Sequence, residues 1–545
     1  MKTKEISVAI VPLTELGETK QFRIVDHFNL TGSSPKGIDF IPITELYLRA
    51  EETENDLEEI MVVALQEAEV PNEEEKAVLL KQGFKAYSYE LIPQALELAA
   101  EGYRLDAKAY ISEIPSGFSL ESDASGVKNY SNLPETEETK KKILDLGIIK
   151  SESPCIWAGV FTKNALKAYC VSNNQDLVGK KISGLIVNSG NANCSTGKAG
   201  NKHDLLMRSE LKSRFNLEAE VLSASTGVIG RKLPVDKIVN SISEIASRSK
   251  KNTESIFDNK NHFEEINNFA KAILTTDLVT KFSQDSQKNM LGIAKGSGMI
   301  APNMATMLTF IITDKKIESL NEAEAQSFMQ NELNRITNKS FNNISVDGDT
   351  STNDMLILLN NQLGESISKE EFSKSLEELC EKLCYKIISD GEGVNKIIDL
   401  RLHDLPISEN NLQRIGKNII NSMLVKTAIF GSDPNWGRIL AAFAREGELL
   451  EGFKPELVEL KILDITIFSN GEDLLDESEL SELSKKMKKS KHIDIEISLA
   501  DNGDLESDSL SKAKAKTSEK SLRSARFLGN DLSYDYVKIN AEYTT

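Results

Sequence analysis

Cysteine is scarce in this sequence, and its few copies form no recognisable pattern. Five cysteines are spread over 545 residues, without a CxxC pair and without histidines at the spacing of zinc ligands. Such a set predicts neither a disulfide framework nor a metal site, so we expect no bound metal. The same scarcity indicates a reducing compartment, and we predict a cytoplasmic protein.

Long apolar runs are missing as well. No stretch reaches the roughly 18 apolar residues that a membrane span needs, so we expect no membrane span. The first residues, MKTKEISVAIVPLTELG, contain only a short apolar run that Pro12 and Glu15 interrupt. They make a poor signal peptide.

Positive charge is in deficit. Lysine and arginine number 65 against 84 aspartates and glutamates, which gives a net charge of −19. An acidic chain is not attracted overall to nucleic acids or to anionic membranes. We therefore expect neither as a partner, while a local basic pocket for an anionic substrate stays compatible with this charge.

Common catalytic designs lack their residues here. Neither GxxxxGK[ST] nor a strand-linked GxGxxG occurs. The chain has only five histidines, and none lies in a loop rich in small residues, so Ser-His-Asp and Cys-His arrangements have little support. If the protein is an enzyme, another group must serve as its general base.

The length corresponds to about three or four domains at roughly 100–200 residues each. Residues 1–50 contain strand-like runs, whereas residues 51–108 are acidic and predict mostly helices. The composition then becomes mixed α/β, and residues 181–192 and 219–230 each predict a buried strand that runs into a loop of small residues.

Two polar segments interrupt this α/β region. Residues 247–262 are rich in Lys, Asn and Ser and predict an exposed loop between helices. Residues 507–524 lie between two strand-like runs and predict an exposed insertion.

Clusters of Gly, Ser, Thr and Asn are abundant. Small residues let a backbone approach a ligand closely and present its N–H groups. Any one cluster could be an ordinary turn, but their number makes that interpretation weaker. They are NSGNANCSTG, SASTGVIG, LTTD, AKGSGMIAPNMATML, SVDGDTSTND, DGEG and FGSDPNWGR.

One of these loops is followed directly by a strand-like run that begins at Thr306. A threonine hydroxyl is a weak nucleophile, but a free α-amine on the same residue, with a pKa of about 7.7–8.0, can act as its base. That amine would be freed only by cleavage after Ala305. The spacing alone fits equally well a threonine that merely begins a buried strand.

Seven motifs together resemble one known family. In their order along the chain they are similar to the ornithine acetyltransferases of arginine biosynthesis, the family of bifunctional glutamate N-acetyltransferases and amino-acid acetyltransferases. The resemblance extends from Pro115 to Thr545. The motifs are STGVIGRKLP, AILTTD, GIAKGSGMIAPNMATML, SVDGDTSTND, DGEGVNK, KTAIFGSDPNWGRILAA and YDYVKINAEYTT.

The resemblance implies a precursor that cuts its own Ala305–Thr306 bond. The acetyltransferase would then consist of an α chain, residues 111–305, and a β chain, residues 306–545. Thr306 would be the nucleophile, first in the cleavage and then in acetyl transfer. The oxyanion hole would be formed by the Thr226 hydroxyl and the Gly227 backbone N–H, which stabilise charge on the carbonyl oxygen.

The resemblance also implies which residues bind substrate. Lys295 would supply a cation for a carboxylate, and Glu392 an anion for the ornithine amine. The alternatives without a binding role are that Lys295 is a solvated loop lysine and that Glu392 is a charge at a helix end. The choice between Thr275 and Thr276 stays open. The substrate-binding residues would be Thr275, Thr276, Lys295, Thr306, Glu392, Asn540 and Thr545.

The implied reaction is a ping-pong transfer of acetyl from N2-acetyl-L-ornithine to L-glutamate, which releases L-ornithine. Bifunctional members also use acetyl-CoA as a donor, and no bound cofactor is expected. The implied fold is the α/β sandwich of self-processing N-terminal-nucleophile enzymes, assembled as an α2β2 heterotetramer. In this scheme Trp436 is a packing anchor rather than a catalytic group.

Residues 1–110 depart from the family, whose members begin near the segment that 114–128 resembles. Within this extension, residues 24–35 and the FIPITELYL that follows are similar to a loop of purine nucleoside phosphorylases. The rest of that enzyme is missing, so we expect an accessory α/β segment of unknown role rather than an active phosphorylase.

Two other classes of function stay open at this stage. A self-cleaving hydrolase would release acetate or a peptide, and it should lack the intact AKGSG, DGEG and C-terminal motifs that this chain has. A non-catalytic paralogue with a binding role would tolerate the loss of Thr306 or of the STG loop, and both are present.

Overall fold

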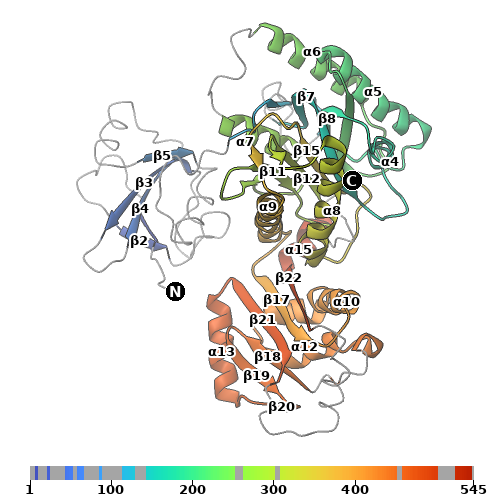
Figure 1. The fold of residues 1–545 in the computed structure, drawn as a ribbon. Helices are drawn as coiled ribbons and strands as arrows, with labels where there is room; N and C mark the ends of the chain where they lie inside the picture. Colours follow the sequence, from blue (N-terminus) through green and yellow to red (C-terminus); the bar gives the residue numbers. More distant parts are fainter. Residues whose placement is uncertain are drawn as a thin grey trace. The chain divides into compact units, whose positions relative to one another are not determined.

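The computed structural model describes residues 113–128, 143–251, 262–300, 307–450, 454, 457–500 and 522–542, together with five strands of the N-terminal segment. The chain divides into two compact units, residues 1–112 and residues 113–545. Figure 1 shows the elements of both.

The N-terminal unit contains a sheet in the order β2-β1-β4-β3-β5. Its strands are β1 (Ile6–Ala9), β2 (Gln21–Ile24), β3 (Ile43–Glu52), β4 (Glu58–Gln66) and β5 (Lys85–Ser88). The strands expected within residues 1–50 are confirmed. The helical prediction for residues 51–108 is wrong over β4 and β5, because the apolar, β-branched run IMVVAL outweighs the acidic residues around it. The rest of that stretch, like most of the phosphorylase-like segment, lies outside the described residues.

The larger unit is built on strand β7 (Leu146–Phe161), which belongs to two groups of strands. Its first part pairs with β6 (Phe118–Asp123) and with β8 (Ile182–Asn191), which in turn pairs with β9 (Glu220–Val228). After a register shift between Lys150 and Cys155, its second part pairs with β15 (Met355–Asn360). Beyond β15 follow β12 (Leu308–Thr313), β11 (Met290–Lys295) and β10 (Lys281–Gln284).

The two groups of strands share one apolar core. Leu185 and Leu222 from the β6–β9 side pack in the same cluster as Phe310 and Ile357 from the β10–β15 side. Two helices, α4 (Tyr169–Gln175) and α7 (His262–Ile273), also contribute to this core.

Helices cover the opposite face of each group. Helices α5 (Gly197–Phe215) and α6 (Val235–Lys251) pack on the β7–β9 side, and α8 (Glu322–Lys339) and α9 (Lys369–Ser389) pack on the β11–β15 side (Figure 1). The strands are therefore buried on both faces, which explains continuous apolar runs such as LTFIIT. Helix, sheet, sheet and helix layers confirm the expected α/β sandwich.

A separate seven-stranded sheet is formed by later parts of the chain, in the order β14-β22-β17-β21-β18-β19-β20. Helices α10 (Glu409–Ile420), α11 (Met423–Phe430) and α12 (Trp436–Phe443) pack on it, and Trp436 stacks on Phe468 with ring centroids 5.1 Å apart. Trp436 is thus a packing residue, as expected. The strands are β14 (Ile344–Ser345), β17 (Ile397–Leu405), β18 (Val458–Ile462), β19 (Ile465–Ser469), β20 (Glu472–Asp473), β21 (His492–Leu499) and β22 (Arg523–Asn530).

The remaining elements are short or peripheral. They are the strand pair β13 (Lys316–Ile317) and β16 (Ser366–Ile367), α13 (Glu477–Lys489) and α15 (Tyr534–Glu542). The polar segment 247–262 connects two helices as predicted, but the loop prediction is wrong for residues 247–251, which belong to α6, and for His262, which begins α7. Residues 507–524 connect β21 to β22, which already begins at Arg523. Residues 252–261 and 501–521 within these connections lie outside the described residues.

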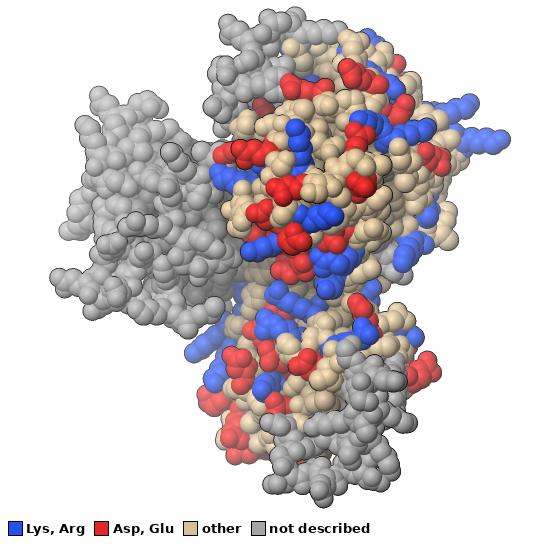
Figure 2. Space-filling model, viewed as in Figure 1, with Lys and Arg blue, Asp and Glu red and all other residues tan. Residues whose placement is uncertain are grey.

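Figure 2 shows acidic and basic side chains interspersed over the visible face of the larger unit. Among the described residues, no helix combines the length and apolarity that crossing a membrane requires.

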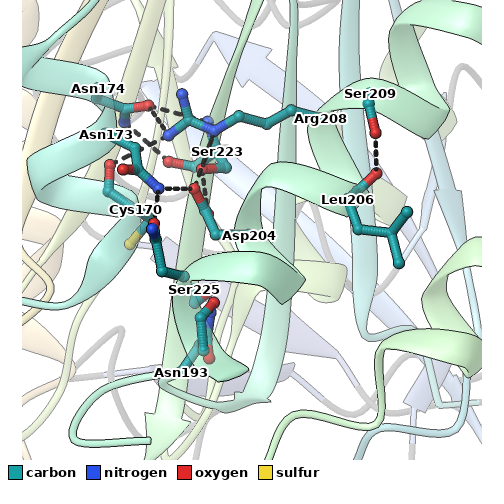
Figure 3. Close-up of polar contacts among 12 residues, drawn as sticks. Cys170, Asn173, Asn174, Asn193, Asp204, Leu206, Arg208, Ser209, Ser223 and Ser225 are labelled. Carbon is teal, nitrogen blue, oxygen red and sulfur yellow. Dashed lines mark hydrogen bonds and ion pairs between the residues drawn. The ribbon is translucent and has the colours of Figure 1, made fainter. Parts of the chain in front are cut away.

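A buried ion pair within α5 is hydrogen-bonded to Ser223 of strand β9 (Figure 3). The Arg208 guanidinium lies 3.0 Å from the Asp204 carboxylate, whose side chain is completely buried. Arg208 also donates to the Ser223 hydroxyl at 2.9 Å and to the side-chain amide oxygen of Asn174 at 2.7 Å. Ser223 lies in β9, three residues before Thr226, so this network supports the strand that carries the predicted oxyanion hole.

We predict that Arg208→Ala lowers the free energy of unfolding by about 3–5 kcal/mol, because Asp204 would stay buried without its cation. The measurement is chemical denaturation followed by circular dichroism. Arg214→Ala is the matched control, since Arg214 lies on the same helix in an exposed pair with Glu210 and should cost less than about 1 kcal/mol. Equal losses in the two variants would contradict this account of α5.

Candidate active site

The predicted oxyanion-hole residues, Thr226 and Gly227, lie at the end of β9. The parallel pairing with β8 places Gly227 opposite Gly190. Gly227 has a φ of +124°, and a Cβ atom there would lie 2.4 Å from the Gly190 carbonyl carbon. A side chain has no room at this position, so the two strand ends meet backbone to backbone.

This loop is bonded to the segment that carries the TTD motif. The Ser189 hydroxyl, in β8, donates to the Ala272 carbonyl oxygen at 2.5 Å. Ala272 lies in the last turn of α7, and Thr275 follows three residues later. The strand ends around Gly227 and the TTD motif are therefore neighbours.

Lys128 lies between the same two regions. A Cβ on Gly190 would lie 2.9 Å from the Lys128 Cγ, and the Lys128 ammonium donates to the Leu144 carbonyl oxygen at 2.9 Å. Burial lowers the pKa of Lys128 to about 8, although the carboxylates of Asp145 and Asp277 counteract this effect. Lys128 is not among the site residues predicted from the sequence.

The predicted residues Thr275 and Lys295 are in direct contact. Lys295, the last residue of β11, donates to the Thr275 hydroxyl at 2.8 Å and lies 4.0 Å from the Asp277 carboxylate. The Lys295 side chain is buried, which excludes the solvated loop lysine. Thr276 is half-buried beside them. Of the two candidate threonines, Thr275 is the one bonded to Lys295.

A second lysine, Lys281, lies buried between two carboxylates. Its ammonium is 2.7 Å from Asp277 and 2.5 Å from Asp390, and about 1% of its side chain is exposed. Burial alone would lower the pKa of Lys281, but the two carboxylates outweigh it and raise the pKa. Lys281 and Lys295 in turn hold the pKa of Asp277 well below its usual range despite burial.

Asp277 and Asp390 also hold the surrounding loops, because their carboxylates accept hydrogen bonds from backbone N–H groups of those loops. Asp277 accepts the backbone N–H of Thr275 at 3.1 Å and that of Gly296 at 2.6 Å. Asp390 accepts the N–H groups of Leu278 and Val279 at 3.0 and 3.3 Å. Carboxylates that accept several backbone bonds fix loop conformation, and here they join the TTD, AKGSG and DGEG motifs.

Glu392 and Asn540 form a second contact between predicted residues. The Asn540 amide donates to the Glu392 carboxylate at 2.8 Å, and the Glu392 N–H donates to the Ser297 carbonyl at 3.0 Å. A Cβ on Gly298 would lie 2.3 Å from the Glu392 carboxyl carbon, so a side chain at residue 298 would displace the Glu392 carboxylate. Glu392 lies within the DGEG turn and is buried, which excludes a solvated charge at a helix end.

Glu392 also acts on Lys295. Burial lowers the pKa of Lys295, and the nearby carboxylates of Asp277, Asp354 and Glu392 counteract that effect. A buried cation and a buried anion therefore face one region, which suits a ligand that carries both a carboxylate and an ammonium group.

Three predicted residues, Ala305, Thr306 and Thr545, lie outside the described residues, and their roles stay predictions. The described chain resumes at Met307, whose carbonyl accepts the N–H of Met355 at 3.1 Å, and β12 begins one residue later. Before the gap, the Ile300 N–H donates to Asp347 at 2.8 Å.

Lys281, Asp277 and Asp390 were missed as site residues. Asp277 and Asp390 are part of the TTD and DGEG motifs, and Lys281 follows Asp277 by four residues, which is a common ion-pair spacing in helices. That spacing was the only available signal, and the segment 277–281 is not helical. The partner Asp390 lies 109 residues away and has no local signature.

We predict that Lys281→Met lowers the free energy of unfolding by about 3–5 kcal/mol, because it leaves two buried carboxylates without their cation. Denaturant titration measures the loss. In the control Lys181→Met, which removes an exposed pair with Glu322, the loss should stay below about 1 kcal/mol. A Lys281→Met protein as stable as this control would show that the carboxylates do not depend on Lys281.

Two known proteins are similar to most of this chain. The chain is 36% identical over 437 residues to the arginine biosynthesis bifunctional protein ArgJ of Bacillus cereus, covering 77% of this chain and 96% of that protein. It is 38% identical over 419 residues to the glutamate N-acetyltransferase of Methanocaldococcus jannaschii, covering 73% and 94% of the two chains.

Two solved structures are similar over parts of the chain. One is the crystal structure of ArgJ from Bacillus halodurans, at 30% identity and a TM-score of 0.34, covering 43% of this chain and 98% of that one. The other is ornithine acetyltransferase from Mycobacterium tuberculosis complexed with ornithine, at 29% identity and a TM-score of 0.27, covering 35% and 93%.

A family model matches most of the chain. The model is described as the ArgJ family, and it matches residues 135–545. The match includes every residue to which the sequence analysis assigned a catalytic or substrate-binding role. The chain belongs to the ArgJ family.

Proposed function

We propose that this protein transfers an acetyl group from N2-acetyl-L-ornithine to L-glutamate. The observation that carries the proposal is the cluster of Thr275, Lys295, Glu392 and Asn540, which places a buried cation and a buried anion in one region. Relatives support it, because one is named a glutamate N-acetyltransferase and another is an ornithine acetyltransferase complexed with ornithine.

The charges in the cluster match the groups on the donor. N2-acetyl-L-ornithine carries an α-carboxylate and a side-chain ammonium, and Lys295 and Glu392 are their proposed partners. L-glutamate presents the same α-carboxylate but ends in a second carboxylate. Lys295 would thus serve both substrates, while Glu392 would favour the donor.

The proposed chemistry uses Thr306 as nucleophile. Its hydroxyl oxygen bonds to the acetyl carbon, the amide C–N bond breaks, and the α-amine of Thr306 relays the hydroxyl proton to the leaving ornithine nitrogen. The glutamate amine then attacks the acetyl ester and regenerates the hydroxyl. Negative charge on the carbonyl oxygen in both steps would be stabilised by Thr226 and Gly227.

A free α-amine on Thr306 requires cleavage of the Ala305–Thr306 bond, and we include this self-cleavage and an α2β2 assembly of the products in the proposal. Acetyl-CoA is a second proposed donor, consistent with relatives named bifunctional. We place the protein in the cytoplasm, since all five cysteines are free and buried, a state that needs no oxidising compartment.

We predict that the purified native protein runs as two chains, residues 1–305 and 306–545, on a denaturing gel, and that it converts N-acetylornithine and glutamate to ornithine and N-acetylglutamate. Thr306→Ala should stay uncut and inactive, because both steps need the hydroxyl. Thr306→Ser, which keeps a hydroxyl, is the control and should retain cleavage. Acetyl-CoA is tested separately as a donor.

Three outcomes would count against this function. A native protein that stays as one chain, or a Thr306→Ala variant that is cut like the native protein, would reject Thr306 as the nucleophile. Release of free acetate without N-acetylglutamate would indicate a hydrolase instead.

We predict that Glu392→Gln raises the KM for N-acetylornithine about ten- to a hundredfold, since it removes the charge that faces the ornithine ammonium. The KM for glutamate should stay the same or fall, because its side chain is itself an anion. Steady-state kinetics with each substrate varied in turn gives both constants. Glu370→Gln, exposed at the start of α9, is the control. Equal increases for both substrates would reject the assigned pairing.

A further inference from the structure

Asn353 lies in the SVDGDTSTND loop, two residues before β15, and has no assigned role in the reaction proposed above. Its side chain is buried, with 4% of its surface exposed. It belongs to the segment that follows Thr306, whereas the predicted oxyanion hole belongs to the segment before it. Any bond from Asn353 to that earlier segment therefore joins the two proposed chains.

The Asn353 carboxamide bridges two backbone carbonyls. Its Nδ2 atom donates to the Ala192 oxygen at 2.7 Å and to the Ser225 oxygen at 2.7 Å. Its Oδ1 atom accepts the Thr352 hydroxyl at 2.6 Å. Backbone carbonyls can only accept hydrogen bonds, so the orientation of this amide is fixed by its partners.

Both carbonyls flank the predicted oxyanion hole. The Ser225 carbonyl belongs to the peptide unit immediately before Thr226, and the next peptide unit contributes the Gly227 N–H. Ala192 follows the end of β8, and its own N–H donates to the Val228 oxygen at 2.9 Å. One side chain thus holds the ends of β8 and β9 on either side of the Gly190–Gly227 contact.

Orientation matters at this place more than elsewhere in β9. An oxyanion-hole donor is effective only when it points at the position that the developing oxyanion occupies. A rotation of the Ser225–Thr226 peptide would turn both the Thr226 side chain and the Gly227 N–H away from that position. Ground-state binding by Lys295 and Glu392 would not depend on this rotation.

We infer that Asn353 is a positioning residue of the oxyanion hole, which it holds in the orientation that stabilises the tetrahedral intermediate. The inference rests on the proposed acetyl transfer. In this role, the segment after Thr306 helps to shape an oxyanion hole whose donors belong to the segment before Thr306.

Asn174, in helix α4, offers a matched control because its side chain bonds to the same strand, β9. Its amide donates to the Ser223 carbonyl oxygen at 2.8 Å, two residues before Ser225 in β9, and it is completely buried (Figure 3). Asn353→Ala and Asn174→Ala each remove a buried carboxamide that donates to a backbone carbonyl of β9, and only the carbonyl bonded by Asn353 adjoins Thr226. Asn174→Ala also removes the acceptor for Arg208 and for the Ser223 N–H, so it is the more demanding control for stability.

The test measures kcat and KM for acetyl transfer in the native protein and in both variants, with rates expressed per cut chain from a denaturing gel. We expect Asn353→Ala to lower kcat about ten- to a hundredfold, with KM for both substrates within about threefold of the native value. Asn174→Ala should lose stability but keep kcat within about threefold. A folded Asn353→Ala variant whose kcat matches that of the native protein, or of Asn174→Ala, would overturn the role.

Thr352→Val covers the case in which Asn353→Ala does not fold, since it removes only the hydroxyl that donates to the Asn353 Oδ1 atom and thereby loosens the carboxamide. A lower kcat with unchanged KM would support the role, and an unchanged kcat would overturn it. Native protein that shows no acetyl transfer would reject the proposed function itself. Active native protein with an unaffected Asn353→Ala variant would reject the positioning role alone.

Discussion

The ammonium of Lys281, held between the carboxylates of Asp277 and Asp390, is the interaction on which the candidate site depends. Those carboxylates accept backbone N–H groups from two different loops, and the cation between them offsets the cost of burying both. Lys295 adds a second cation next to Asp277. The substrate-facing charges of Lys295 and Glu392 are thus supported by charges that have no direct contact with substrate in the proposed scheme.

The sandwich positions this cluster by bringing strand ends together. β9 ends at Thr226–Gly227, β11 ends at Lys295, and β15 begins just after the loop that contains Asn353. Because the strands themselves are buried on both faces, their apolar side chains fix register, while the loops at their ends are free to carry polar groups. Small residues recur there since backbone must approach backbone, as at Gly190 and Gly227.

Local sequence patterns were sufficient for the buried strands and insufficient for their polar contacts. The runs at 181–192 and 219–230 were identified because continuous apolar residues leave little alternative, whereas acidic residues around β4 concealed a strand. The contacts of Thr275, Lys295, Glu392 and Asn540 were implied by resemblance, not by spacing. The contacts of Lys281 with Asp390 and of Asn353 with Ala192 and Ser225 could not be predicted from local sequence, because these partners lie more than a hundred residues apart.

In the strand order β11-β12-β15-β7, the two strands that follow Thr306, β12 and β15, lie between β11 and β7, which precede it. Six residue pairs join β11 to β12, and six join β15 to β7. A cut at Thr306 would therefore leave two polypeptides interleaved in one sheet, with neither able to complete its own core. Such a protein folds once as a single chain, and after the cut its refolding becomes a second-order encounter of two incomplete halves. The stability of the mature protein would then depend on its having folded before the chain was cut.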